Sequence, residues 1–303
     1  MIAVCIPVFN RNITALATAL SSQMTALNKD GEILIMDDGS DASWQAINAS
    51  IAHLPFVRYV PGTKNHGRIR IRQLLAQNAR FNWLVFLDGD SLLLSPRFLQ
   101  NYFDELSDTP CVVPGGRIYS QTPPPDCTCR LHWKYGTVRE APNTANRNRK
   151  PYAGFMSNNF LVHKSIFNQL QFHDSFTGYG HEDTWIGIQL ETLQVPVKYI
   201  DNAVEHDGVE ATAVFLAKTV NALQNLARLQ KLVPVAQLKA HVRLYAFYYT
   251  LKTYRLLWLP RLLQTLMGLY IKTNLHSCNP SLFLFDVYRL HQFIDMQQAG
   301  SDL

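Results

Sequence analysis

The sequence predicts an α/β fold with a mostly parallel sheet flanked by helices, followed by a helical C-terminal extension. In the first third of the chain, short apolar runs alternate with segments of helical length. Each apolar run ends in polar, turn-forming residues. Beyond about residue 211, apolar residues recur at spacings of three and four, which is the period of a helix. Alternating strands and helices indicate right-handed crossovers, so the carboxyl ends of the strands should meet at one edge of the sheet.

The elements follow in a regular order. We expect strands over residues 2–7, 33–36 and 83–87, and helices over residues 13–27, 42–52 and 67–79. The run over 83–87 is apolar throughout and bounded by polar residues, which is typical of a strand covered on both faces. A further turn and strand are expected over 153–162, and a short strand ends near 204–206.

Carboxylates gather where the strands end. Asp37 and Asp38 follow the second strand, and Asp88 and Asp90 follow the third. Four carboxylates on one rim repel one another unless a cation, hydrogen-bond donors or both offset their charge. Two carboxylates one residue apart on a turn can bind a hard divalent cation, the usual partner of a diphosphate. The alternative for Asp88-Gly89-Asp90 is an ordinary turn with a capping Asp.

The order and spacing of four segments resemble a known family. The segments are 6–10, 35–40, 65–68 together with Arg72, and 86–91. Over roughly residues 1–210, the chain is similar to family 2 glycosyltransferases, which have the GT-A (Rossmann-like) fold. The conjunction of the four segments is specific, whereas each segment alone is a weak signal.

The resemblance implies roles for named residues. The nucleotide-binding residues would be Pro7, Phe9, Asn10, Asp37, Asp38, Arg68, Arg72 and Asp88. Which of Asp37 and Asp38 contacts the base is open. The resemblance also implies that Asp88, Asp90 and His206 bind Mn²⁺ or Mg²⁺ on the diphosphate, with a purely structural histidine as the alternative for His206.

An acidic pair follows a glycine-punctuated loop over residues 176–185. By the resemblance, Asp183 would be the general base of an inverting transfer, and Glu182 would bind donor or acceptor hydroxyls. The alternative is that both acids merely complement the dipole of a helix start. The expected acceptor-binding residues are Asn158, Tyr179, His181 and Trp185, and Asn159 can also reach sugar hydroxyls. Many relatives have Gly-Gly where this chain has Gly180-His181, so acceptor specificity is open.

The leading hypothesis is an inverting, metal-dependent glycosyltransferase. It would move a hexose or N-acetylhexosamine from a nucleotide diphosphate sugar, with UDP favoured by the resemblance, to a hydroxyl of a glycan or lipid-linked saccharide. One alternative is a catalytically silent sugar-nucleotide or glycan-binding protein on the same fold. A nucleotidyltransferase would need a glycine-rich basic loop after the first strand, and residues 7–12 do not provide one. Scattered basic residues argue against nucleic-acid binding.

The chain divides into a glycosyltransferase domain over 1–210 and a helical region over 211–303. The domain comprises a nucleotide-sugar half, about 1–115, and an acceptor half, about 116–210. Residues 120–151 contain three consecutive prolines and an Asn- and Arg-rich stretch, so little regular structure is expected there. This segment is either a lid over the donor or a disordered insertion.

Residues 241–275 combine aromatic, leucine and basic residues and contain no Asp or Glu. This composition suits peripheral contact with a membrane, and a net charge of +5 agrees with it. The alternative is that these helices pack only on the core and on one another. A membrane span is not expected, because Arg255, Pro260 and Arg261 interrupt the apolar run.

The expected location is the cytoplasm, with possible attachment to the inner face of the membrane. The first strand follows Met1 directly, without a secretory leader. Five cysteines, an odd number with Cys5 in a buried strand, agree with a reducing compartment. Cys127 and Cys129 form the only close pair, and no second pair at zinc spacing accompanies them.

Overall fold

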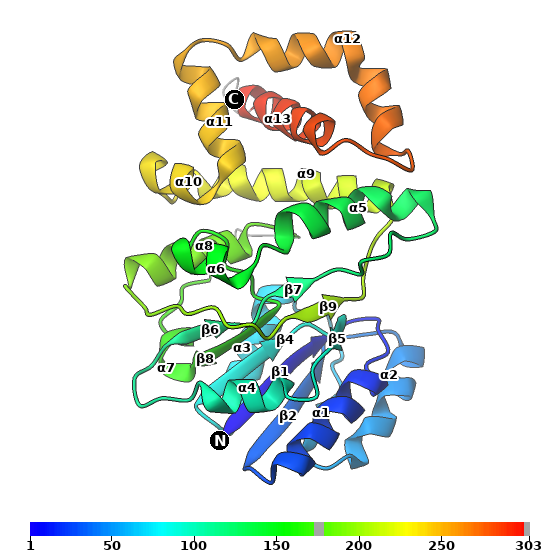
Figure 1. Ribbon diagram of the computed structural model, residues 1–303, viewed down its shortest axis with the longest axis vertical. Coiled ribbons are helices and arrows are strands. Elements are labelled where there is room, and N and C mark those ends of the chain that lie inside the picture. Colours follow the sequence, from blue (N-terminus) through cyan, green and yellow to red (C-terminus); the bar gives the residue numbers. More distant parts are fainter. Residues whose placement is uncertain (173–178, 300–303) are drawn as a thin grey trace.

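A computed structural model describes residues 1–172 and 179–299 (Figure 1). Its main sheet has six strands in the order β3-β2-β1-β4-β8-β6. The strands are β1 (Ile2–Val8), β2 (Gly31–Asp37), β3 (Val57–Val60), β4 (Trp83–Leu87), β6 (Val112–Pro114) and β8 (Asn159–His163). Only β8 runs antiparallel to its neighbours β4 and β6. The predicted mostly parallel sheet is therefore confirmed.

Helices cover both faces of this sheet. Helices α1 (Thr14–Leu27) and α4 (Phe98–Asp104) pack on the face that carries Ile2, Val4 and Ile6. Helices α3 (Arg68–Asn78), α7 (Lys164–Phe167) and α8 (Glu182–Thr192) pack on the face that carries Ala3 and Cys5. Successive residues of a strand point to opposite faces, so an uninterrupted apolar run serves both layers. Each fully buried Ile or Val side chain contributes about 1.5–3 kcal/mol.

The predicted elements of the first half are present with small shifts. The helix expected over 42–52 is α2 (Ala42–Ala49) followed by a short 3-10 helix, η1 (Ser50–His53). Strand β3 was not expected, because its four residues are only partly buried and include Arg58 and Tyr59. It pairs in parallel with β2 and extends the edge of the sheet.

A second, three-stranded sheet lies beside the carboxyl ends of the main strands. It consists of β5 (Ser91–Leu93), β9 (Val204–His206) and β7 (Arg117–Ile118), in the order β5-β9-β7. In the antiparallel β5–β9 pair, Ser91 stands opposite His206. This register brings residues more than a hundred positions apart in the sequence to the same edge as Asp88 and Asp90.

The segment over 120–151 is largely helical, so the expectation of little regular structure is wrong. It contains η2 (Cys127–Cys129), α5 (Arg130–Tyr135), a π-helical turn η3 (Gly136–Glu140) and α6 (Thr144–Arg149). Tertiary packing stabilises these short helices: Leu131 of α5 is fully buried in a cluster with Phe215 and Phe285 from the C-terminal helices. The proline-rich stretch that suggested disorder covers only the start of the segment.

The C-terminal region is helical, as predicted. It comprises α9 (Thr212–Leu229), α10 (Val235–His241), α11 (Arg243–Thr253), α12 (Trp258–Leu275) and α13 (Leu282–Ala299). These helices form a layer at one end of the molecule, with α9 next to α5 and α8 and with α12 farthest from the sheet (Figure 1). Across residues 1–172 and 179–299, none of the helices combines the length and the apolar character needed to cross a bilayer.

A disulfide joins Cys127 to Cys278 across 151 positions of sequence, whereas Cys5, Cys111 and Cys129 are free. It ties η2 to the turn between α12 and α13. This bond does not fit the reducing compartment expected from the odd number of cysteines. The sequence could not reveal it, since the two partners meet only when the C-terminal helices pack on residues 120–151.

Replacing Cys127 and Cys278 with Ser should lower the melting temperature under oxidising conditions. A crosslink that closes so long a loop restricts the unfolded chain and typically contributes about 2–4 kcal/mol. Adding a reductant to the wild-type protein should lower its melting temperature to that of the variant. Cys129→Ser is the matched control. Equal melting of wild type and double variant without reductant would show that the bond does not stabilise the protein.

Candidate active site

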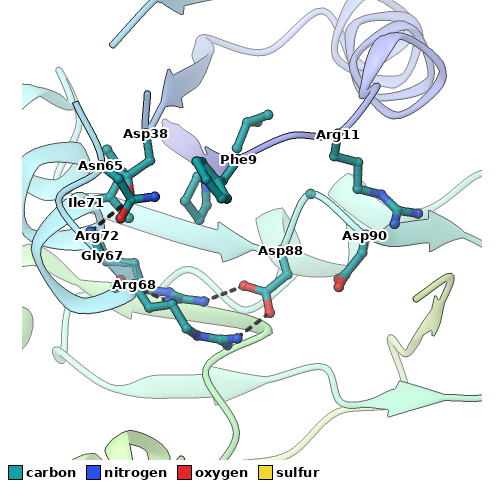
Figure 2. A pocket seen from close by; sticks show the side chains of 13 residues that line it. Phe9, Arg11, Asp38, Asn65, Gly67, Arg68, Ile71, Arg72, Asp88 and Asp90 are labelled. Atoms are coloured by element: carbon teal, nitrogen blue, oxygen red, sulfur yellow. Dashed lines mark hydrogen bonds and ion pairs between the residues drawn. The ribbon is translucent and has the colours of Figure 1, made fainter. Parts of the chain in front are cut away.

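A pocket opens at the carboxyl ends of β1, β2 and β4 and at the start of α3 (Figure 2). Its wall is formed by Pro7, Val8, Phe9, Arg11, Asp38, Asn65, Gly67, Arg68, Ile71, Arg72, Asp88, Gly89 and Asp90. Six of the eight residues expected at the nucleotide are in this wall. The other two, Asn10 and Asp37, are not.

Asp37 and Asp38 have different surroundings. The Asp37 carboxylate accepts hydrogen bonds from the Ser40 amide (2.7 Å) and from Gln45 Nε2 (3.2 Å), which holds the turn after β2. The Asp38 carboxylate accepts from the backbone amides of His66 (2.7 Å) and Gly67 (3.0 Å). Burial raises the pKa of Asp38, and these two amides oppose that rise. Of these two carboxylates, Asp38 lines the pocket and Asp37 does not.

Asn10 braces the ends of two strands. Its backbone N–H donates to Ser40 Oγ (2.8 Å), and its side-chain Oδ1 accepts from the backbone N–H of Asp41 (2.8 Å). The neighbouring Gly39 has a φ of +79°, and a Cβ there would lie 2.5 Å from the carbonyl carbon of Lys64. Only glycine allows the two loops to approach so closely. Asn10 therefore shapes the pocket without lining it.

Two arginines of α3 hold Asp88. Arg72 Nη2 donates a hydrogen bond to Asp88 Oδ1, and Arg68 Nη2 lies 3.7 Å from Asp88 Oδ2 (Figure 2). Arg68 Nε also lies 3.2 Å from Glu182 Oε1 at the start of α8. Since Arg68 contacts both carboxylates, it links the nucleotide pocket directly to the acidic helix start.

Asp90 faces His206 as a consequence of the β5–β9 register. Asp90 Oδ1 lies 3.5 Å from His206 Nδ1, and the Asp90 carbonyl accepts from the Asp207 amide (2.8 Å). Burial acts to raise the pKa of Asp90, but His206, Arg117 and Arg11 hold it well below its usual range. The Asp90 carboxylate is therefore ionised at neutral pH.

Asp90 and His206 fit a divalent cation as one oxygen and one nitrogen ligand. Across the described part of the chain, no three His, Cys, Asp or Glu side chains are arranged to hold a metal ion by themselves. The Asp88 carboxylate points toward Arg68 and Arg72 (Figure 2). A Mn²⁺ or Mg²⁺ bound by Asp90 and His206 would thus take its remaining oxygen ligands from a diphosphate and water.

Asp183 stands at the first turn of α8. Its Oδ1 accepts a hydrogen bond from the Ser157 amide (3.2 Å). Burial, together with the negative charge of Glu182, raises the pKa of Asp183 to about 6. A carboxylate with a pKa in this range can take a proton from a substrate hydroxyl near neutral pH. Next to Ser157, Asn158 is buried, and its Oδ1 has no hydrogen-bond partner among the described residues.

The expected acceptor residues are not all in one place. The Tyr179 ring is contacted by Arg68 and Lys218, whose cations each lie 5.2 Å from its centroid. Trp185 packs against the C-terminal helices, and its indole N–H donates to the Gln171 carbonyl (2.6 Å). The His181 ring lies 3.1 Å from Thr184 Oγ1, and burial lowers its pKa to about 4. Residues 176–178 of the same loop lie outside the described residues.

Asn159 cannot bind a sugar, contrary to expectation. It is fully buried, its Oδ1 accepts from the Tyr102 hydroxyl (2.6 Å), and its Nδ2 donates to the carbonyls of Gly116 and Asn202 (2.9 Å each). Sequence reasoning also overlooked Arg11 and Arg117. Arg11 lines the pocket and pairs with Asp207 (2.8 Å).

Arg117 is not part of the pocket wall, and only 11% of its side chain is exposed. Its Nη1 lies 3.4 Å from Glu140 Oε2 and 3.3 Å from the Tyr119 hydroxyl. Its charge contributes to the low pKa of Asp90. The sequence signal for Arg117 is the pair Gly115-Gly116, which follows the strand over 112–114 and directly precedes this arginine. Glycine permits a tight turn at the end of a strand, so the pair indicates that the chain turns at the same edge of the sheet.

The sequence model described as glycosyl transferase family 2 matches residues 3–170. The chain belongs to this family. Its fold is the GT-A fold, as the order of its motifs indicated. The match covers the strands and turns that form the pocket, together with the segment that carries Asn158.

Two curated relatives are uncharacterised glycosyltransferases of Rickettsia. The chain is 36% identical over 91 residues to one from Rickettsia conorii and 35% identical over 91 residues to one from Rickettsia felis. Each match covers 30% of this chain and only 15% of the relative's own length. The mannosyltransferase PcManGT from Pyrobaculum calidifontis, solved with GDP-Man and Mn²⁺, superposes with a TM-score of 0.53 at 13% identity. The superposition covers 96% of this chain and 86% of that one, and it shows a shared fold.

Proposed function

We propose that this glycosyltransferase moves a hexose or N-acetylhexosamine from a nucleotide diphosphate sugar to a hydroxyl of a glycan or lipid-linked saccharide, with inversion. The observation that carries the proposal is Arg68, which contacts both Asp88 in the nucleotide pocket and Glu182 beside Asp183. Donor and acceptor groups thus share one site. In this proposal, residues 1–115 bind the donor, 116–210 complete the acceptor side, and 211–303 form a separate helical region.

The donor would bind along the pocket wall. Phe9 exposes 52% of its surface beside Pro7 and offers an aromatic face to a base. Asp38 lies on the same wall and can accept from base or ribose groups. Arg68 and Arg72 supply two cations for diphosphate oxygens, and planar guanidinium groups suit these oxygens. Asp88 holds both arginines in place.

Asp90 and His206 would hold Mn²⁺ or Mg²⁺ at the diphosphate end of the pocket. When bound, this ion supplies positive charge that stabilises the departing nucleoside diphosphate. The mannosyltransferase PcManGT, which shares the fold, was solved with both GDP-Man and Mn²⁺, which supports a metal requirement. UDP remains our preferred nucleotide, on the resemblance alone.

Asp183 would act as the general base. It takes the proton of the acceptor hydroxyl while that oxygen bonds to the anomeric carbon and the bond from this carbon to the diphosphate oxygen breaks. A single displacement of this kind inverts the anomeric configuration. Glu182, Asn158 and Tyr179 would bind sugar hydroxyls and the apolar ring face. From their packing, we propose that His181 and Trp185 affect the acceptor by holding the loop.

Calorimetric titration with UDP- and GDP-sugars, each with Mn²⁺ and with chelator, tests the donor and the metal together. We expect one donor to bind in the presence of Mn²⁺ and to lose most of its affinity in chelator. Binding of no donor would contradict the proposal. Tight donor binding without transfer to any glycan or lipid-linked acceptor would instead indicate a silent binding protein.

A further inference from the structure

Helix α12 turns large apolar side chains toward solvent. Leu262, Leu266 and Leu269 recur at spacings of four and three, and Leu266 and Leu269 expose 72% and 82% of their surface. The opposite side of the helix is buried through Ile271 and Leu275, which pack with α5, α9 and α13. We define the α12 apolar face as Trp258, Leu259, Leu262, Leu263, Leu266, Met267, Leu269 and Tyr270, all of them exposed.

The segments flanking α12 carry exposed apolar side chains too. Phe247 of α11, Tyr254 just before α12 and Phe283 of α13 are exposed as well. Helix α12 lies at the end of the molecule remote from the central sheet (Figure 1). A helix face with so many exposed large apolar side chains marks an interaction site, because such a face costs free energy to hydrate.

The charge of this region identifies the partner. Residues 211–285 contain nine Lys or Arg and no Asp or Glu, whereas the rest of the chain has more acidic than basic residues, so the positive net charge of +5 comes from this segment. Arg255 lies between Tyr254 and Trp258 in sequence, Lys272 is next to the apolar face, and both are exposed. Arg261, in contrast, pairs with Asp295 (3.4 Å). The free cations therefore favour an anionic partner.

We infer that the α12 apolar face inserts into the interface of an anionic lipid bilayer, with α12 lying along the membrane surface. Leucine and aromatic side chains would bury among the acyl chains and headgroups, while the surrounding Lys and Arg would contact anionic headgroups. A second copy of the chain fits this surface less well. A symmetric contact would bring two acid-free, basic segments together, and their like charges would repel.

Membrane docking would also orient the site. Helix α9 packs against α13 and touches the acidic loop, where Asn225 Nδ2 donates to the Gly180 carbonyl (3.0 Å). Helix α9 thus connects α13 to the residues just before Asp183. The inference goes beyond the proposed function and does not depend on it, since vesicle binding is measured without donor or acceptor.

Flotation of the full chain with vesicles tests the inference. We expect binding to vesicles of phosphatidylcholine with 30% phosphatidylglycerol, and much weaker binding to phosphatidylcholine alone or in high salt. Leu266→Ser with Leu269→Ser should weaken binding about tenfold or more, because two apolar side chains leave the bilayer. Arg255→Gln with Lys272→Gln should weaken it about 30-fold at low salt, since each basic residue near an anionic surface favours binding by about fivefold.

Matched controls distinguish the α12 apolar face from a general effect of substituting exposed residues. Ile47→Ser with Val138→Ser removes two exposed apolar side chains elsewhere, and Arg149→Gln with Lys150→Gln removes two exposed charges. Both controls should bind as the wild type does. Absence of vesicle binding by the wild type, or equal binding by the Leu266/Leu269 variant, would overturn the inference. A dimer in solution that this variant dissociates, without vesicle binding, would assign the face to a second copy instead.

Discussion

Asp183→Asn should lower the rate of sugar transfer by about 10²–10⁴-fold, the usual contribution of a general base. Asparagine preserves the shape of the side chain and can still accept the hydrogen bond from the Ser157 amide, but it cannot take a proton. Metal-dependent donor binding should remain nearly intact, because Asp183 does not line the nucleotide pocket. The expected result is thus a loss of turnover at unchanged donor affinity.

The pH dependence of the wild type gives an independent check. The pKa of Asp183 is raised to about 6 by burial and by Glu182, and the base works only when ionised. Turnover should therefore fall as the pH drops below about 6, approaching tenfold per unit, and should level off above it. Glu182→Gln removes one of the charges that raise this pKa. The fall in turnover on the acid side of the pH profile, its acid limb, should therefore move to lower pH.

Asp201→Asn is the matched control for this experiment, since Asp201 is an exposed carboxylate away from the pocket. Turnover, donor affinity and the acid limb should all match the wild type. Substantial turnover in Asp183→Asn would show that another group takes the proton. An acid limb that persists in that variant would assign the titration to a different residue.

Asp90→Ala should abolish both metal-dependent donor binding and transfer. Loss of a group that merely supports a metal ligand costs roughly 10–100-fold in metal affinity, so loss of a ligand should cost about 100-fold or more. The remaining partner, His206, provides a single ligand. Titration of Mn²⁺ in the presence of a fixed donor concentration measures the effect directly.

Asp207→Ala is the control for Asp90. Asp207 follows His206 in sequence and pairs with Arg11 (2.8 Å), but the side chains of both residues are substantially exposed to solvent. Such a pair contributes at most about 1 kcal/mol. This variant should keep its Mn²⁺ dependence. If Asp90→Ala binds donor as well as the wild type at every Mn²⁺ concentration, the proposed metal ligand is wrong.

Much of the fold is determined by local sequence. The apolar runs that form β1, β2 and β4 end in turn-forming residues, and the segments between them have the length and period of helices. These features depend only on neighbours along the chain, and so they predicted the parallel sheet and its carboxyl edge. The order of the motifs along that edge was enough to indicate the family.

Tertiary structure decided which roles similar residues have. Asp37 and Asp38 are adjacent and chemically identical, yet the amides of Ser40 and of His66 and Gly67 give them different roles. Those amides come from loops that meet only in the folded chain. The sequence could therefore not indicate which of the two carboxylates lines the pocket. It also could not indicate that the Asn159 side chain makes its hydrogen bonds to buried protein groups.

By itself, the sequence determined the central strands β1, β2 and β4 with the helices between them, the acidic motifs and the basic, aromatic C-terminus, because each depends on residue type and local spacing. Only the tertiary structure decided the pairing of β5 with β9, which sets Asp90 beside His206, and the contact of Arg68 with both Asp88 and Glu182. It also decided the bond between Cys127 and Cys278 and the helices over 120–151. The physical reason is that these contacts join distant segments, whose encounter depends on how whole layers pack rather than on local preference.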